Sequence, residues 1–297
     1  MTRIRDFAAL KAALRERGFR PRSSLGQNFL LSPGVLQDIV KHAEVGPEDR
    51  VVEIGVGAGS LTGFILEAGA SLLGVEIERK LLGVTWQQYK YVGDRLRLLN
   101  LNVLGKGKVL SGEFRDELLK LKEQGGWKLV ANLPYNISTP IFMEIMASEI
   151  RPVNIVVLVQ RDFAERVCAS PGGRNYSPVS VLASTFGSAR IVRNVPAKLF
   201  WPVPEVESSV VKWVASSEPP KIANEKLFFR TVSLLFTARR KKIVNVLRNI
   251  SKIAPEFSLG PHDEFFAFTG ISPDSRAEQL PPEAFLKAAK FFDRAQV

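Results

Sequence analysis

From Arg50 onward, short runs of apolar residues alternate with longer segments in which apolar residues recur at helical spacing. Continuous β-branched runs are typical of parallel strands, because helices cover both faces of such a sheet. The pattern therefore predicts an α/β doubly wound fold. The five runs expected to form parallel strands are RVVEIG, SLLGVEI, RLRLLNL, KLVANL and NIVVLVQ, and two further strands are expected at ARIVRNV and SSVVKWVA.

The pattern changes at residues 216–221, where the sequence SSEPPK is typical of a linker. The remainder has helical periodicity and little strand signal, so we expect one domain of residues 1–215 and a small helical domain of residues 216–297. Helical spacing continues through Arg239 to Lys242, which predicts that these four cations lie on a helix and that at least one covers apolar surface with its stem. The run is either a solvated helix end or a phosphate contact.

The charge of the chain points to a polyanionic partner. Its 297 residues carry a net charge of +11, and the release of counterions from phosphates favours binding by clustered Lys and Arg. Nucleic acid is the leading candidate, although many basic proteins are simply soluble enzymes. The longest apolar runs fall far short of the roughly 20 residues that a membrane span needs.

Few residues could form disulfides or bind metal. A single cysteine, Cys168, excludes an internal disulfide framework, and His42 and His262 lie too far apart for a metal cluster to be recognised by spacing. We expect a cytoplasmic protein in which Cys168 is a small half-buried side chain rather than a nucleophile. The basic N-terminal segment is expected to belong to the mature protein, with a mitochondrial presequence as the alternative.

A glycine-rich turn follows the first predicted strand. In VVEIGVGAGSLT, Gly55, Gly57 and Gly59 let the backbone turn sharply and approach a ligand before a helix that Ser60 or Thr62 begins. The G-x-G-x-G spacing departs from the dinucleotide fingerprint. Tight packing of the strand against the helix is the alternative interpretation.

Two further residues make a nucleoside-bearing cofactor the better interpretation. Glu76 ends the next predicted strand, where a carboxylate accepts hydrogen bonds from both hydroxyls of a ribose. Asn102 follows the third strand, where it can accept a hydrogen bond from an adenine amine. A solvated acid at the strand end is the alternative for Glu76.

The segment NLPYNISTP, which begins at Asn132, completes a set of motifs that identifies a family. The chain resembles the small-subunit ribosomal RNA adenine dimethyltransferases, which use S-adenosylmethionine. This resemblance implies a Rossmann-like seven-stranded methyltransferase sheet with a small C-terminal helical domain. The motifs that carry it, in order, are SLGQNFL (from Ser24 to Leu30), VEIGVGAGSLT, GVEIERKL, NLPYNISTPI, FWPVPEVESSVV and RAEQLPPEAF.

The resemblance also implies the reaction and the partner. Two methyl groups are added to each of two adjacent adenosines near the 3′ end of the small-subunit RNA, presented by an immature ribosomal particle. The enzyme is expected to act as a monomer, without a metal and away from membranes. The basic N-terminal arm and the run from Arg239 to Lys242 are then expected to hold phosphates while a pocket reads one base.

The cofactor-binding residues implied by the resemblance come from separate motifs. Glu76 is expected to bind the ribose and Asn102 to lie beside the adenine. Asn102 stands where the family usually has an aspartate, and an amide brings no negative charge, so we expect weaker cofactor binding. The full cofactor set is Asn28 and Leu30 at the methionine end, Gly55 in the turn, Glu76, Asn102 and Asn132.

The expected catalytic residues hold an adenine by its exocyclic amine. The side-chain oxygen of Asn132 and the carbonyl of Leu133, held by Pro134, accept its two N–H bonds and favour a pyramidal, more nucleophilic nitrogen. Tyr135 stacks on one face of the base, and Phe200 closes the other. Two such faces can hold a flipped base, since stacking contributes roughly 1–3 kcal/mol per base, comparable with the few kcal/mol needed to unstack it. A core role is the alternative for both Tyr135 and Phe200.

Three other functions remain open. A relative that methylates a large-subunit adenosine and confers antibiotic resistance shares the same pocket, although NLPY and RAEQL favour the small-subunit enzyme. A weakly active ribosome-assembly factor is suggested only by Asn102. A nicotinamide-dependent oxidoreductase is disfavoured by the glycine spacing. The stretch from Leu104 to Gly126 is longer than usual and has no assigned role.

Overall fold

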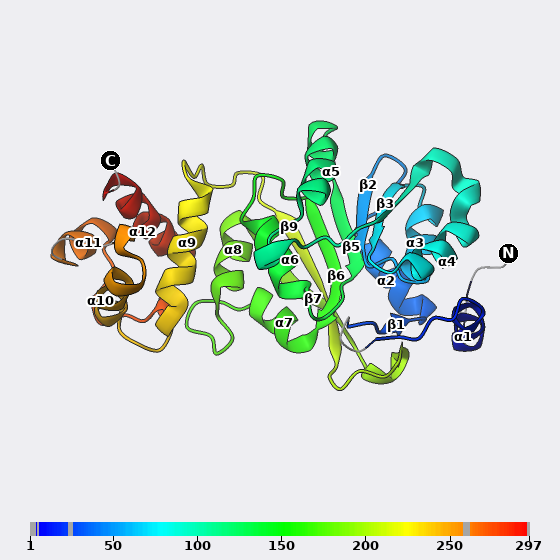
Figure 1. Ribbon diagram of the computed structural model, residues 1–297. Helices are drawn as coiled ribbons and strands as arrows, with labels where there is room; N and C mark the ends of the chain where they lie inside the picture. The colour runs from blue at the N-terminus through cyan, green and yellow to red at the C-terminus, as the bar shows by residue number, and fades with distance from the viewer. Residues whose placement is uncertain (1–3, 5, 23–25, 258–261, 296–297) are drawn as a thin grey trace. The chain divides into compact units, whose positions relative to one another are not determined.

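The computed structural model describes residues 4, 6–22, 26–257 and 262–295 (Figure 1). It contains two compact units. The first holds the residues up to 145 together with 150–164 and 189–215, and the second holds 146–149, 165–188 and the chain from 216 onward. Residues 165–188, which the sequence pattern places in the first domain, thus pack with the C-terminal helices. As functional domains, residues 1–215 and 216–297 stay a prediction.

The first unit is built on a seven-stranded sheet with the strand order β4-β3-β2-β5-β6-β9-β7. The strands from β2 to β6 run parallel to their neighbours, and β9 runs antiparallel to β6. The predicted α/β fold and its seven strands are therefore confirmed. Their bounds are Arg50–Ile54 (β2), Ser71–Glu76 (β3), Leu96–Asn100 (β4), Lys128–Asn132 (β5), Asn154–Gln160 (β6), Gly187–Val195 (β7) and Ser208–Ala215 (β9).

The central strands are apolar along their length because both of their faces are covered. Leu129, Val130 and Ala131 of β5 are fully buried, and so are residues 155–159 of β6. Hydrophobic burial of such runs is the main favourable term in folding. The strand β4 lies at the sheet edge, and apart from Leu96 its residues are exposed or only partly buried, which fits its position.

Seven α-helices of the described chain begin before residue 165. Asp6 starts the first by accepting a hydrogen bond from the Ala9 amide at 2.8 Å, and Ser111 starts α5 in the same way. The helix α5 occupies the stretch to which the sequence assigned no role. The helices are Phe7–Glu16 (α1), Pro33–His42 (α2), Ser60–Glu67 (α3), Arg79–Tyr89 (α4), Gly112–Glu123 (α5), Ser138–Met146 (α6) and Arg161–Val167 (α7).

A second, two-stranded sheet joins two motifs that are distant in sequence. The strand β1 (Phe29–Leu30) pairs antiparallel with β8 (Phe200–Trp201). Phe29 lies opposite Trp201, and Leu30 lies opposite Phe200. Ser24 and Leu25 of the SLGQNFL motif lie outside the described residues. The sequence pattern did not predict this pair, because two residues are too few to show periodicity.

The second unit is helical, as expected for the C-terminal part. Its helices pack through aromatic contacts, such as Phe186 against Phe228 with ring centroids 6.2 Å apart and Phe236 against Phe285 at 5.6 Å. The helices are Pro178–Phe186 (α8), Glu225–Leu235 (α9), Ile243–Ile253 (α10), His262–Thr269 (α11) and Pro282–Ala295 (α12).

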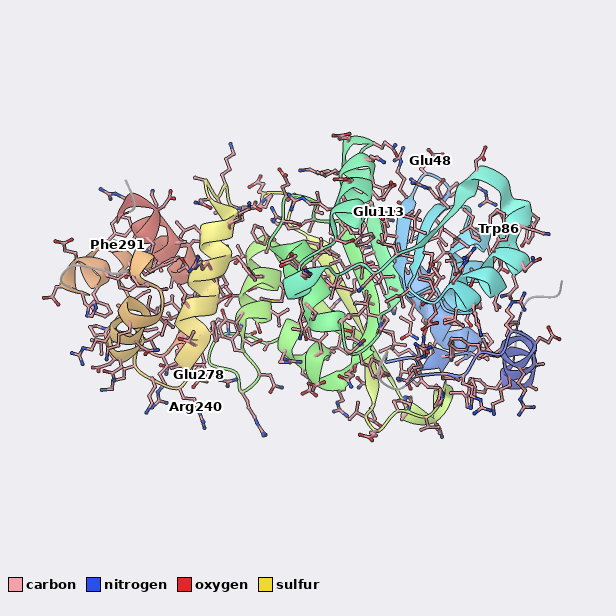
Figure 2. The ribbon with its side chains drawn as sticks, in the orientation of Figure 1. Glu48, Trp86, Glu113, Arg240, Glu278 and Phe291 are labelled. Atoms are coloured by element: carbon pink, nitrogen blue, oxygen red, sulfur yellow. The ribbon has the colours of Figure 1, made fainter. Side chains whose placement is uncertain are left out.

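The basic run does not lie on a helix, so that prediction is wrong. The chain leaves α9 at Leu235, and residues 239–242 form a turn before α10. Hydrogen bonds and ion pairs to distant residues stabilise this turn in place of a continued helix. Arg239 binds Glu278 at 2.9 Å and the Arg174 carbonyl, and Lys242 binds Asp274 at 2.7 Å. Arg240 and Lys241 are exposed, and Figure 2 shows Arg240 beside Glu278 at one end of α9.

Two observations bear on the expectations from composition. Among the described residues, no helix combines the length and apolar character required to cross a bilayer. Burial raises the pKa of the Cys168 thiol to about 11, so the thiolate is scarcely populated near neutral pH. Cys168 therefore fits the expected half-buried structural role rather than that of a nucleophile.

Candidate active site

The strand order brings the predicted cofactor residues to one edge of the sheet. The carboxyl ends of β4, β3, β2 and β5 lie side by side, and the order of connection reverses between β2 and β5. Ligands bind open α/β sheets at such a switch point. Gly55 follows β2, Glu76 ends β3, Asn102 follows β4, and Asn132 ends β5.

A cavity lies at this position and is lined by residues from all four strand ends and from the N-terminal motif. Nine of the ten predicted site residues line it, which brings together motifs that are more than one hundred residues apart. They are Asn28, Leu30, Gly55, Glu76, Asn102, Asn132, Leu133, Pro134 and Tyr135.

The glycine turn is shaped for close approach of backbone groups. Gly55 has φ +79°, and a Cβ at this position would lie 3.1 Å from the Pro134 ring. Gly57 has φ +55°, and a Cβ there would meet the Phe29 ring at 3.3 Å. Both positions therefore require glycine for conformation as well as for space. The helix α3 begins at Ser60, as the sequence predicted.

Glu76 is held in place by the backbone of two segments. Its carboxylate accepts a hydrogen bond from the Gly57 amide at 3.0 Å and another from the Glu78 amide at 2.9 Å. Burial raises the pKa of Glu76, and these hydrogen bonds oppose the rise. A buried carboxylate fixed in this way at a strand end can accept hydrogen bonds from a diol.

The wall beside Glu76 suits a flat aromatic base. Ile77, Leu101 and Val103 line the cavity on either side of the exposed Asn102. The Asn102 side-chain oxygen accepts a hydrogen bond from the Leu104 amide at 3.2 Å, which orients the side chain. This combination of apolar surface with one oriented amide fits a purine, and together with Glu76 it fits a nucleoside.

The NLPY turn is connected directly to the N-terminal motif. The Asn132 side-chain nitrogen donates to the Asn28 carbonyl at 3.1 Å. A carbonyl only accepts hydrogen bonds, so this contact assigns the nitrogen and leaves the Asn132 side-chain oxygen on the other branch of the amide. The Pro134 carbonyl accepts hydrogen bonds from the Ile137 amide and the Ser138 hydroxyl, which fix the turn that leads into α6.

Tyr135 is fixed at both its backbone and its hydroxyl. The hydroxyl lies 2.6 Å from that of Ser208 at the start of β9. Gly26, with φ +62°, packs so closely that a Cβ there would lie 2.9 Å from the Tyr135 nitrogen. Burial raises the pKa of the Tyr135 phenol, so the phenol is neutral near neutral pH. The half-buried ring lines the cavity.

Phe200 is the one predicted site residue that does not line the cavity. Only 1% of the residue is exposed, and it belongs to a core cluster that includes Leu30, Leu36 and Val210. In this structure its ring supports Leu30 from the core side. The alternative of a core role describes what is observed, and the role of Phe200 as a second wall for the base stays a prediction.

The sequence analysis missed Glu53. This residue of β2 lines the cavity although only 2% of it is exposed, and it accepts a hydrogen bond from the Thr62 hydroxyl at 2.6 Å. Burial raises its pKa to about 8, with the Thr62 bond acting in the opposite direction. A glutamate inside an otherwise apolar run of a parallel strand is the signal that could have identified it, because both faces of such a strand are covered.

Comparison with known proteins shows the family of the chain. The sequence profile described as "Ribosomal RNA adenine dimethylase" matches residues 18–294. A ribosomal RNA small subunit methyltransferase A from Moorella thermoacetica is 35% identical over 287 residues, covering 94% of this chain and 95% of the relative. A protein of the same name from Streptococcus pyogenes is 33% identical and covers 97% of both chains.

Solved structures support the fold. A dimethyladenosine transferase from Plasmodium falciparum superposes with a TM-score of 0.71 at 22% identity and covers 91% of this chain and 98% of that one. The 23S rRNA methyltransferase ErmE gives a TM-score of 0.61 at 20% identity and covers 89% and 99%. The family match spans most of the chain, and the relatives match over nearly their full length. The chain therefore belongs to the ribosomal RNA adenine dimethylase family.

Proposed function

We propose that the protein uses S-adenosylmethionine to dimethylate two adjacent adenosines near the 3′ end of small-subunit ribosomal RNA. The observation that carries this proposal is the shared wall between the nucleoside-shaped cavity and the NLPY turn. Asn132 lines the cavity and bonds to Asn28, so a base held at Asn132 lies next to a cofactor held between Gly55 and Glu76. The name that these relatives share, ribosomal RNA small subunit methyltransferase A, supports the choice of RNA.

The residues of the cavity have separate tasks toward the cofactor. Glu76 would bind the two ribose hydroxyls, and Asn102 would face the adenine between apolar side chains. The backbone at Gly55 and the segment from Asn28 to Leu30 would hold the methionine end. When bound, S-adenosylmethionine supplies an electrophilic methyl carbon on a positively charged sulfur.

The NLPY turn prepares the nucleophile. The lone pair of an adenine exocyclic amine is delocalised into the ring, so the nitrogen is a poor nucleophile. The Asn132 side-chain oxygen and the Leu133 carbonyl would accept its two N–H bonds and favour a pyramidal nitrogen whose lone pair points at the methyl group. A base held in this way would take the methyl group from the sulfonium, leaving a neutral thioether, and its amine proton would pass to solvent. Positioning supplies most of the rate enhancement.

Tyr135 would hold the flipped base by stacking, with its ring fixed through Ser208. After the first methyl transfer the amine keeps one N–H bond. A single acceptor is then enough to orient the amine for the second transfer. In the second unit, Arg240 and Lys241 are exposed in the basic turn and would contact phosphates outside the pocket.

The test is transfer of labelled methyl groups to undermethylated small ribosomal subunits. The parent protein is expected to label them, and Asn132→Ala is expected to lower kcat by about 100-fold or more, because the substitution removes a positioned acceptor. Mapping the modified bases by reverse transcription distinguishes small-subunit from large-subunit targets. Equal labelling by both proteins would exclude Asn132 from the mechanism, and absence of labelling by the parent would favour an assembly factor.

A further inference from the structure

A second hollow of the first unit lies beside α1 and is strongly basic. We call it the N-terminal groove. It is lined by α1, the segment that follows it, the first turn of α4 and Trp201. Six of its lining residues are cations, contributed by three separate segments of the chain: Lys11, Arg15, Arg20, Arg22, Arg79 and Lys80.

The groove is built on a packed helix rather than on a loose arm. Leu10 and Leu14 of α1 are buried in one cluster with Leu81 and Val84 of α4. Gln88 of α4 accepts a hydrogen bond from the backbone of residue 4 at 3.0 Å, and its amide group also donates to the Ala58 carbonyl at 2.7 Å. The two helices that carry these cations are therefore held at fixed positions relative to one another.

The charges of the groove are not balanced from within. Of the described residues that line it, Glu78 alone carries a carboxylate, and it lies 3.3 Å from Arg22. Lys80 donates to the Gly18 carbonyl at 3.0 Å, which brings no countercharge. Arg15 and Arg79 are exposed. Like charges gathered in this way repel one another, so an anion that bridges them lowers the electrostatic free energy.

An aromatic ring at the groove distinguishes between possible anions. The Trp201 ring stacks against Phe29 with centroids 6.1 Å apart and planes inclined by 24°. The Lys11 ammonium lies 4.9 Å from the centroid of the indole. A tryptophan beside a row of cations is typical of surfaces that bind single-stranded nucleic acid, since every base has a face to stack and every nucleotide carries a phosphate. An acidic peptide carries no base that could stack on the ring.

The groove shares a wall with the cavity of the active site. Phe29 lines the cavity and stacks on Trp201, which lines the groove. Glu78 lines the groove, and its amide donates to Glu76 in the cavity at 2.9 Å. One wall thus separates the two hollows, so a strand that binds in the groove lies next to the cofactor site.

We propose that the N-terminal groove binds the RNA strand next to the target adenosine, with its cations on successive phosphates and Trp201 as the platform for one base. This inference rests on the proposed function and assigns a substrate-binding subsite to it. A base that stacks on Trp201 takes the place of the Lys11 ammonium, which then contacts a phosphate. The groove would fix the direction in which the strand approaches, while Asn132 reads the flipped base.

The first experiment measures the salt dependence of RNA binding. A fluorescein-labelled oligoadenylate of about 12 nucleotides is titrated with the full-length protein by anisotropy at several salt concentrations. The triple substitution Arg15→Gln, Arg20→Gln and Arg79→Gln removes three phosphate contacts. It should reduce the slope of log K against log salt by about 2, since each contact to a single strand contributes about 0.7.

The matched control removes the same net charge elsewhere in the first unit. The substitutions Lys41→Gln, Lys106→Gln and Lys122→Gln change three exposed lysines that line neither the groove nor the cavity. The slope of this control should equal that of the parent. Equal slopes for the control and the groove variant would overturn the inference, because the groove would then contribute only general charge.

The second experiment tests the platform. Trp201→Leu should weaken binding of the oligoadenylate by about 5-fold to 100-fold without changing the salt slope, and Trp201→Phe should restore most of the affinity. If Trp201→Leu binds like the parent, the base does not stack there. If polyglutamate displaces the RNA as well as oligoadenylate of equal charge does, the groove is a surface for acidic proteins and the inference fails.

Failure of the groove and failure of the proposed function give different results. Methyl transfer by the parent and calorimetric binding of S-adenosylmethionine report on the function. If the parent methylates small subunits while the groove variant keeps the salt slope of the control, only the groove is refuted. If the parent binds RNA through the groove but transfers no methyl group, only the proposed reaction is refuted.

Discussion

Replacing Glu53 by glutamine should remove a large pH dependence of stability. The carboxyl group is buried in β2, and burial raises its pKa from 4.5 to about 8. The folded protein therefore holds this proton more tightly than the unfolded chain does. The free energy of unfolding should fall as the pH rises from about 4.5 to about 8, by about 1.4 kcal/mol for each pH unit, and the slope from this group should vanish above that range.

The magnitude follows from the width of that window. A difference of about 3.5 pKa units corresponds to an upper bound of about 5 kcal/mol. Glutamine is neutral at every pH, and its carbonyl can still accept the hydrogen bond from Thr62. Between pH 5 and pH 8.5 the free energy of unfolding of Glu53→Gln should therefore rise relative to that of the parent by up to this amount. Any cost of the new amide group is independent of pH and shifts the whole difference curve without changing its slope.

Urea unfolding of the cofactor-free protein across this range measures the difference directly. The control is Glu48→Gln, which removes an exposed carboxylate of the same unit (Figure 2). Its stability curve should run parallel to that of the parent. If the Glu53→Gln curve is also parallel to the parent from pH 5 to pH 8.5, Glu53 is not held protonated by burial, and the argument is wrong.

Three further predictions concern the cavity and the core beside it. Asn102→Asp should bind S-adenosylmethionine several-fold more tightly in calorimetry, because it adds a charge that strengthens the bond to the adenine amine; equal or weaker binding would contradict this. Gly26→Ala should lower kcat by up to about 100-fold, because its Cβ would lie 2.9 Å from the Tyr135 nitrogen, whereas Gly34→Ala, with nothing within 4 Å, should change kcat little. Phe200→Leu should lower the free energy of unfolding by about 1 kcal/mol and leave kcat nearly unchanged, as expected for a core residue; a large loss of kcat at constant stability would restore its role as a wall for the base.

The strands could be predicted because burial on both faces leaves an unambiguous signal. The fully apolar, β-branched stretch from Ile155 to Val159 is typical of a strand whose two faces are both covered. The basic run was harder to interpret, since its neighbours keep the helical period on both sides. The chain leaves the helix at Leu235 because Arg239 binds Glu278, a partner that only the folded chain brings near.

The candidate site shows the same division. The order of the motifs along the chain gives the order of the strand ends, so Glu76 and Asn132 could be assigned to one cavity. The contact between Gly26 and the Tyr135 backbone could not, because it depends on a glycine of positive φ that meets a turn more than one hundred residues away. Glu53 was overlooked for a different reason. Its signal, a single acid inside the apolar run VVEIG of a parallel strand, is present in the sequence.

The two aromatic residues of the motif FWPVPEV illustrate how strand geometry decides function. Neighbouring residues of a strand point to opposite faces, so Phe200 and Trp201 cannot both face the same hollow. The register of β1 and β8 places Phe200 opposite Leu30 in the core and Trp201 opposite Phe29 at the groove. A change of register by one residue would exchange these faces. In the proposed groove the aromatic ring available to RNA is therefore that of Trp201, while the role of Phe200 as a wall for the base stays a prediction.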